Sequence, residues 1–324
     1  MGGVVDLQRM LKKCHSEQWS VGDLDWSRPP KPMLPETERA IVQYFTDMAG
    51  IERLAGALFE EQRKRAVDPV LEEIFSTFVQ DELRHAHVAQ MLADYYNVHH
   101  YEHYQTNGHL LRFAPHFVNA IRYLSNEIAN AYITSGELIL DIALLRSIND
   151  FVDDAMSQEA MDRVNRDESR HIAIDFHMVE YYCSDEYIQT LKQRPPLPPR
   201  ERIRAAWSFT CVLWFAAPFF KAVFFEPMDL VDPEGKRMME AFRRIQLLSR
   251  RNQVKSRPFV RFMLTLQDLY NTPVVGRVLG RVLRRTIGVD PRFIVQLYSE
   301  VELERTNGMS FDALAQEALA VKYA

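Results

Sequence analysis

Residues 167–171, with the sequence Asp-Glu-Ser-Arg-His, decide the fold, because residues 81–85 repeat them as Asp-Glu-Leu-Arg-His. On an α-helix, a glutamate and a histidine three residues apart lie on one face, about one turn from each other. A carboxylate oxygen and an imidazole nitrogen placed in this way can bind one metal ion. One such pair often arises by chance, whereas two copies in the same five-residue frame indicate a paired metal site.

Each copy follows another glutamate at almost the same distance. Glu52 precedes Glu82 by 30 residues, and Glu137 precedes Glu168 by 31 residues. A helical hairpin that turns in the middle of such an interval brings its two glutamates to the same height. Each then lies about 21 Å from the turn, at 1.5 Å of helix rise per residue. We therefore predict four helices with one glutamate on each.

Helix-start signals lie where these turns are needed. Asp68-Pro69 offers an N-cap followed by proline at the first helical position, and residues 151–154 (Phe-Val-Asp-Asp) have the same role in the second interval. Glu60 and Glu61 are rival carboxylates, but they would lie about 10 Å off the level of the motif glutamate. The spacing therefore favours Glu52 as the ligand.

The pattern resembles the ferritin-like dimetal-carboxylate superfamily, in which two helices each supply a glutamate and two others each supply Glu-x-x-His inside a four-helix bundle. The Asp-Glu-x-Arg-His form is most similar to the oxygen-activating branches. These are the bacterial multicomponent monooxygenases, the ribonucleotide reductase small subunit, the acyl-carrier desaturases and the p-aminobenzoate N-oxygenase type. The resemblance covers roughly residues 34–183. It implies as metal ligands Glu52, Glu82, His85, Glu137, Glu168 and His171.

The resemblance also implies a chemistry. Oxygen and imidazole ligands suit iron or manganese, and the family precedent favours two iron ions, with manganese or a mixed manganese/iron pair as alternatives and O2 as co-substrate. We expect an oxygenase or oxidase that hydroxylates, N-oxygenates or desaturates a small or carrier-bound organic substrate. The alternatives are an acyl-carrier-protein desaturase and a non-enzymatic ferroxidase or metal-binding protein. No Gly-x-Gly-x-x-Gly or Cys-x-x-Cys motif is present, so a separate ferredoxin or reductase is expected to supply electrons.

Further residues of the motif are expected behind the ligands. In the resembling family the aspartate before each motif glutamate accepts a hydrogen bond from the metal-bound histidine of the other half, which assigns that role to Asp81 and Asp167. We expect Arg84 and Arg170 to hold these aspartates in bidentate pairs. The alternative is that these residues form ordinary ion pairs on a helix surface.

Two departures from the relatives narrow the reaction. Radical-bearing reductase subunits have a tyrosine four residues after the first-motif histidine, where this chain has Ala89. The N-oxygenase type has an extra histidine one turn before the second-motif glutamate, where this chain has Val164. A tyrosyl radical and a third imidazole ligand are therefore not expected at these positions.

The periodicity predicts an all-α chain, because strand-like alternation persists nowhere. We expect an irregular N-terminal arm over residues 1–33, a ferritin-like four-helix bundle over 34–193 and an additional C-terminal helical region over 200–324, packed on the bundle. Four prolines among residues 195–199 mark the boundary. The bundle helices are predicted at residues 35–66, 69–97, 115–148 and 153–183. A cluster of four histidines within residues 98–112 lacks zinc-site spacing and is interpreted as a polar loop.

The apolar stretch at residues 207–225 is long enough to cross a membrane. Pro218 and Lys221 interrupt it and no second span is evident, so we expect a buried helix. A membrane-surface or acyl-chain contact and a span are the alternatives, and membrane association is not expected.

Charge and cysteine content indicate the compartment and the partners. The net charge is −5, yet residues 200–324 hold 20 basic and 13 acidic residues. This asymmetry is either a solvated surface or a dock for an acidic partner. Three cysteines without motif spacing and an N-terminus without a signal-peptide pattern favour the cytoplasm. A homodimer is a further possibility, and no nucleic-acid partner is expected.

Overall fold

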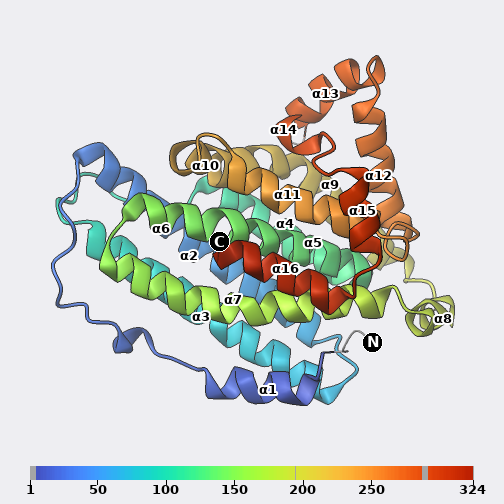
Figure 1. Cartoon of the computed structure of the whole chain (residues 1–324), viewed down its shortest axis with the longest axis horizontal. Coiled ribbons are helices and arrows are strands. Elements are labelled where there is room, and N and C mark those ends of the chain that lie inside the picture. The colour runs from blue at the N-terminus through green and yellow to red at the C-terminus, as the bar shows by residue number, and fades with distance from the viewer. Residues whose placement is uncertain (1–4, 194, 287–290, 324) are drawn as a thin grey trace.

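The computed structural model describes residues 5–193, 195–286 and 291–323, and these ranges contain helices and no strand. The predicted all-α class is therefore confirmed for this part of the chain. Helices run side by side along the long axis of the molecule (Figure 1). Their apolar faces form one large buried cluster that extends from Cys14 in the first helix to Ala318 in the last.

Four helical segments, which we call the core segments, carry the two motifs and the two glutamates that precede them. The first and second of these segments pack tightly together, as do the third and fourth, and the two pairs also touch. Their bounds are α2 (Pro35–Arg63), α3 (Pro69–Tyr96), α5 with its continuation (Asn126–Ile139, then η2, Leu140–Leu145, and α6, Arg146–Val152) and α7 (Ala155–Tyr182).

Both predicted turn signals act as the sequence indicated. The Asp68 side chain accepts a hydrogen bond from the Val70 amide at the start of α3, with Pro69 at the first position. Asp154 caps α7 in the same way. The preceding Asp153 adopts the left-handed conformation, with φ 48°, which ends α6 and reverses the chain. Local sequence signals therefore set the positions of the two turns that align the glutamates.

The third helix differs from the prediction of one helix over 115–148. Helix α4 (Gly108–Tyr123) ends before Leu124, whose backbone is extended, and α5 then starts a new helix. The Arg65 guanidinium binds the carbonyl oxygens that this end exposes, with Nη2 at 2.7 Å from Ile121 O. A side chain from a distant segment therefore satisfies the free carbonyls, which periodicity does not reveal.

The sequence had suggested an irregular N-terminal arm, but part of the arm is helical. Helix α1 (Leu7–Ser16) starts at the N-cap Asp6, packs against α3 and buries Cys14. A short helical turn, η1 (Val21–Asp23), follows, and the chain then runs along the outside of the core segments to α2 (Figure 1). The arm thus covers the face where α3 and α7 meet.

The C-terminal region packs along the core segments over much of its length. Helix α9 lies against α4, α11 against α5 and η2, and α16 against α7. In order, the helices after α7 are α8 (Asp185–Gln193), α9 (Pro199–Phe220), η3 (Lys221–Phe225), α10 (Glu226–Val231), α11 (Lys236–Arg250), α12 (Pro258–Asn271), α13 (Val275–Thr286), α14 (Pro291–Ile294), α15 (Glu300–Asn307) and α16 (Phe311–Tyr323).

Two helical segments are long and apolar enough to cross a membrane, Asn126–Val152 and Pro199–Val231. The expectation that the chain holds no second such segment was therefore wrong. The first segment is mostly buried among the other helices, as the core helix of a globular protein is. The second is 39% buried, so the prediction of a buried helix at residues 207–225 holds for one face only.

Candidate metal centre

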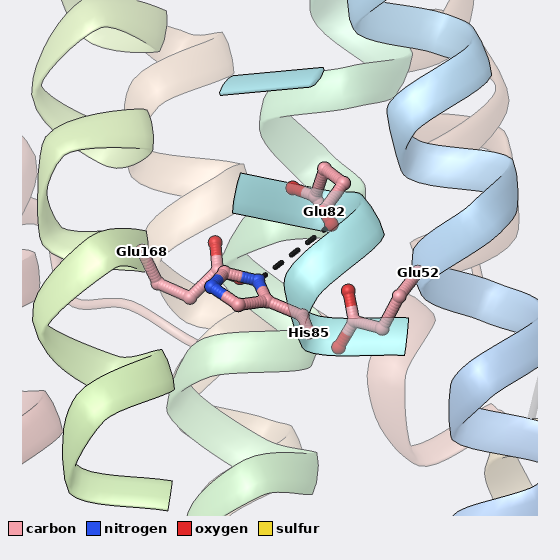
Figure 2. Close-up of side chains that lie close together, drawn as sticks. All are labelled: Glu52, Glu82, His85 and Glu168. Carbon is pink, nitrogen blue, oxygen red and sulfur yellow. Dashed lines mark ion pairs between the residues drawn. The ribbon is translucent and has the colours of Figure 1, made fainter. Parts of the chain in front are cut away.

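Two groups of four acidic and histidine side chains lie buried between the core segments. One comprises Glu52, Glu82, His85 and Glu168, and within it the possible ligand atoms lie within 4.8 Å of one another. Figure 2 shows these four side chains converging from α2, α3 and α7. The other group replaces two members and consists of Glu82, Glu137, Glu168 and His171. The structure therefore brings together all six residues that the sequence singled out.

Glu82 and Glu168 belong to both groups, which makes the centre double. Glu52 and His85 complete the first group, and Glu137 and His171 complete the second. The Nδ1 atom of His85 lies 2.9 Å from a Glu168 oxygen, and His171 Nδ1 lies 2.8 Å from the other oxygen of Glu168. Two adjacent positions thus share a pair of carboxylates, and each keeps its own glutamate and histidine.

The other nitrogen of each imidazole faces an aspartate of the opposite motif. His85 Nε2 lies 3.2 Å from Asp167 Oδ2, and His171 Nε2 lies 3.5 Å from Asp81 Oδ2. Asp81 and Asp167 are fully buried. An imidazole that donates its Nε2–H to a carboxylate presents the Nδ1 lone pair to the centre, so this arrangement fixes the ring orientation for metal binding.

The two arginines of the motif link the aspartates, in a way that differs from the expected bidentate pairs. Arg170 Nη2 lies 3.0 Å from Asp81 and 2.8 Å from Asp167, and Arg84 Nη2 also contacts both. Each guanidinium therefore bridges the two halves of the repeat. Arg170 is completely buried, which rules out an ordinary surface ion pair for this residue and requires charged partners on several sides.

The N-terminal arm supplies further partners that sequence reasoning missed. Trp19 Nε1 donates to Asp167 Oδ2 at 2.6 Å, Gln18 contacts Asp81 at 3.3 Å, and Glu17 pairs with Arg170 at 3.0 Å. Three consecutive residues of the arm thus bind the charged network behind the ligands. No motif marks these contacts, because they depend on where the arm lies over α3 and α7.

Burial and mutual charge shift the pKa values of the centre in opposite directions. Burial, reinforced by the charges of Glu82 and Glu168, raises the pKa of Glu52, and burial likewise raises the pKa of Glu137. Burial alone would raise the pKa of Glu168 too, but the charge and hydrogen bonds of the histidines outweigh it and lower that pKa. The protein has therefore concentrated more carboxylates than its own cations neutralise.

The residues present fit a pair of divalent metal ions. Both Glu82 oxygens are buried and accept no hydrogen bond from the residues that the structure describes, and the Nδ1 atoms of His85 and His171 face carboxylate oxygens of the same cluster. Buried polar atoms are normally satisfied, so such a cluster needs an explanation such as an ion. Four carboxylates balance the charge of two divalent cations, and the oxygen and imidazole donors suit iron or manganese.

Close helix packing beside the centre depends on a glycine. A Cβ atom at Gly56 of α2 would lie 3.2 Å from Glu82 Cβ of α3, which is tighter than ordinary contact. A glycine at this position either serves packing or makes room for oxygen or substrate. The measured approach favours packing, since the space beside Gly56 is already occupied by the Glu82 side chain.

The rival carboxylates and the histidine cluster lie elsewhere. Glu60 pairs with Arg63, and Glu61 accepts from Arg122 at 2.8 Å. His99 of the loop after α3 pairs with Glu38 instead of joining other histidines. Neither Glu60 nor Glu61 belongs to the two groups among the described residues, which agrees with the choice of Glu52 from helix height.

Two more buried carboxylates adjoin the centre. Asp141 follows Glu137 by four residues and Asp175 follows His171 by four, so each lies one turn beyond a candidate ligand. Burial raises the pKa of Asp175, and nearby Glu168 and Asp141 add to that effect. The repeated spacing of four residues was the signal that could have identified this pair. Asp141 also lies in η2, where the helix widens into π geometry, a distortion common at functional sites.

An apolar cavity of about 210 Å³ lies between α2 on one side and η2, α6, η3 and α10 on the other, and none of the six candidate ligands lines it. Tyr44, Met48 and Ile51 of α2 line one side, and Leu140 and Leu144 of η2 line another. Ile51 directly precedes Glu52. Burial and the Glu52 charge raise the pKa of Tyr44, which keeps this phenol neutral at the edge of the cavity.

Comparison with protein-family models, with curated proteins and with solved structures gives no match to this chain.

Proposed function

We propose that this chain is a ferritin-like, O2-activating di-iron oxygenase or oxidase that acts on a small or carrier-bound organic substrate. One observation carries the proposal: two buried groups of ligand atoms share Glu82 and Glu168. A single metal site does not need two carboxylates in common with a second group. The donor set, the all-helical fold and the doubled motif support the same conclusion.

The ligands have distinct roles in this proposal. Glu52 and His85 would help to hold one iron ion and Glu137 and His171 the other, and Glu82 and Glu168 belong to both ligand groups. When bound, ferrous iron would supply two electrons to O2, and O2 would be the oxidant of the organic molecule. Asp81 and Asp167 hold the histidines, and the buried surroundings exclude water from the centre.

The apolar cavity between α2 and η2 supports an organic substrate over iron storage. Its lining is largely apolar and includes Tyr44, whose pKa is raised by burial and by the Glu52 charge. In a hydroxylation, one oxygen atom of O2 enters a C–H bond and the other leaves as water. The reaction also consumes two protons and the two electrons that ferrous iron gives to O2. A separate ferredoxin or reductase would return these electrons to the iron. A desaturation uses the same electron balance and releases both oxygen atoms as water.

Anaerobic loading with ferrous iron followed by rapid mixing with O2 tests the proposal. We expect about two iron ions per chain, a transient absorption band on mixing, and a faster decay of that band when an accepted substrate is present. The double variant His85→Ala/His171→Ala should give no band. A cage of many subunits that takes up far more than two ions per chain would instead identify an iron-storage protein.

A further inference from the structure

Helix α9 exposes a stripe of large apolar side chains. Ile203, Trp207 and Trp214 are 70%, 66% and 78% exposed, and their spacing of four and seven residues places them on one face of the helix. The opposite face, with Val212 and Phe219, is buried toward α4. The helix is therefore buried along one side against α4, and its other side leaves these three large side chains exposed.

The neighbouring helices continue this apolar surface. Helix α13 packs on both α9 and α12, and these three helices lie together at one edge of the molecule (Figure 1). Exposed apolar side chains on α12 and on α13 with its preceding residue are Phe262, Met263, Leu269, Val274, Val275, Val278 and Val282. An area with two tryptophans and this many aliphatic side chains exceeds the scattered apolar residues of an ordinary surface.

Two glycines explain why the valines of α13 face outward. A Cβ atom at Gly276 would lie 1.9 Å from the Tyr270 carbonyl oxygen, and one at Gly280 would lie 2.9 Å from the Tyr270 ring. The glycine side of α13 therefore packs closely on α12, and Val278 and Val282 lie on another side of the helix. The outward position of the valines is built into the packing of α13.

The same surface is strongly basic. Residues 258–286 contain five arginines and one acidic residue, Asp268, which already pairs with Arg250. Arg261, Arg277 and Arg281 are exposed and form no ion pair with the residues that the structure describes. The side chains of Arg284 and Arg285 lie outside the described part of the chain. Earlier in the C-terminal region, by contrast, Arg243 and Arg244 of α11 are paired with acidic side chains.

We propose that α9, α12 and α13 form a docking surface for the face of an anionic phospholipid bilayer. Tryptophan at the level of the headgroups, aliphatic side chains at the acyl boundary and arginines beside them are the features of helices that lie in a membrane interface. The basic residues complement the negative charge of the lipid phosphates. Helix α9 would lie parallel to the membrane, because its other side packs against α4.

Other occupants fit this surface less well. A second copy in a two-fold dimer would bring the same basic patch against itself, which repels. An acidic protein would pair with Arg277 and Arg281 but would leave Trp207, Trp214 and Phe262 without an apolar partner. A bilayer with anionic headgroups satisfies both kinds of side chain. This inference is independent of the metal centre and holds whatever reaction the centre performs.

Co-sedimentation with phosphatidylcholine vesicles, with and without phosphatidylglycerol, tests the proposal on the full chain. We expect binding to the anionic vesicles that weakens as salt rises, with a blue shift of tryptophan emission. The pair Arg277→Glu/Arg281→Glu should weaken binding at least about tenfold, given the contribution of each basic residue near such a surface. The pair Trp207→Ser/Trp214→Ser should weaken it by at least about tenfold too and abolish the emission shift.

A matched control comes from α15, whose Val301 is 75% exposed but lies outside the three helices. Val301→Asp should bind vesicles like the unmodified chain. All the substituted side chains are exposed, so we expect the surface variants to fold, and circular dichroism checks this. The proposal is overturned if the protein binds no vesicle at low salt, if the tryptophan pair binds normally, or if alkaline carbonate fails to release the bound protein, which would indicate a spanning helix. A dimer that Trp214→Ser dissociates in the absence of vesicle binding would also overturn it.

Discussion

His85 on α3 lies with Nε2 3.2 Å from Oδ2 of Asp167 on α7, so the histidine of one motif is held by the aspartate of the other. The reciprocal pair, His171 and Asp81, repeats the relationship. Arg84 and Arg170 contact both aspartates. Each five-residue motif is thus incomplete alone, and the two copies form one charged unit across the helix pair.

Removing either histidine should reduce the metal content sharply. His85→Ala and His171→Ala each delete one candidate ligand from one group, and the double variant deletes both. We expect about two ions per unmodified chain, fewer in each single variant and almost none in the double variant, measured by elemental analysis after ferrous loading. His99→Ala is the control, because His99 pairs with Glu38 in a loop. Two ions in the double variant would refute the assignment.

Changing the aspartates to asparagine should weaken the centre without abolishing it. Asp81→Asn and Asp167→Asn keep the shape of the side chain but lose the charge that orients the histidine and faces the arginines. We expect a loss of about 10–100-fold in metal affinity or activity, measured by competition with a chelator. Asp94→Asn, at an exposed position of the same helix α3, should leave the affinity unchanged. Unmodified affinity in both motif variants would argue against the role of these aspartates.

Glu52→Ala and Glu61→Ala should have separable effects. Glu52 belongs to the first ligand group, so its alanine variant should lose metal. Glu61 pairs with Arg122 and Lys64 outside both groups. Its variant should keep the metal but lose stability, because Glu61 is buried and its removal takes away the carboxylate that pairs with Arg122. Metal analysis together with urea unfolding distinguishes the two, and the reverse pattern would mean that the α2–α3 hairpin aligns different residues.

Gly56→Ala and Gly136→Ala form a matched pair of helix substitutions. Alanine in a helix interior gains about 1 kcal/mol over glycine. A Cβ atom at position 136 meets nothing within 4 Å, whereas one at position 56 meets Glu82 at 3.2 Å. Gly136→Ala should therefore raise the melting temperature. Gly56→Ala should gain less and should lower metal affinity because Glu82 must shift; an equal gain at both positions with unchanged affinity would show that α2 and α3 separate freely.

The metal-free protein should become less stable as the pH rises above about 6.5. Burial would lower the pKa of His85 and of His171, but the surrounding carboxylates outweigh it and raise both above the ordinary value of 6.5. A raised pKa contributes stability that is complete below the unfolded-state value and is lost as the pH rises through the folded-state value. The raised pKa values of Glu52 and Glu137 act in the same direction.

Metal binding should reverse this dependence, because the ions displace the same protons and bind more tightly as pH rises. Thermal unfolding between about pH 6 and pH 9 measures both effects. The melting temperature of the metal-free chain should fall across this range, and the increase on adding metal should grow. The double variant His85→Ala/His171→Ala is the control and should show a smaller fall. A metal-free chain that gains stability over this range would contradict the expected direction.

Much of the centre follows from spacing alone, because a helix converts sequence intervals into positions in space. Glu52 and Glu82 meet because Asp68 starts a new helix midway between them. Because the motif is repeated, the glutamate and histidine of each copy must point into the same interior. This requirement fixes which face of each motif helix turns inward. Local signals of this kind are readable from one sequence, since each acts within a few residues.

The features that were missed depend on contacts between distant parts of the chain. Trp19 reaches Asp167 only because the N-terminal arm crosses α7, and Arg65 binds the carbonyl oxygens at the end of α4 from the turn after α2. The exposure of Trp214 has the same origin: its stretch is apolar enough for a core, but α4 covers only one side of α9. Hydrophobicity indicates which residues avoid water and does not indicate whether the fold provides a partner.

Sharing Glu82 and Glu168 also determines how the protein fills with metal. One divalent ion among four buried carboxylates leaves uncompensated negative charge, and that state is costly in a dry interior. The first ion also draws both shared carboxylates into place for the second. Binding should therefore be cooperative, so that a limiting supply of metal yields empty and doubly loaded chains in place of a uniform half-loaded population. If the centre holds two ions as proposed, the doubly loaded fraction at low free metal would vary with the square of the metal concentration, so occupancy would rise steeply over a narrow range of metal supply.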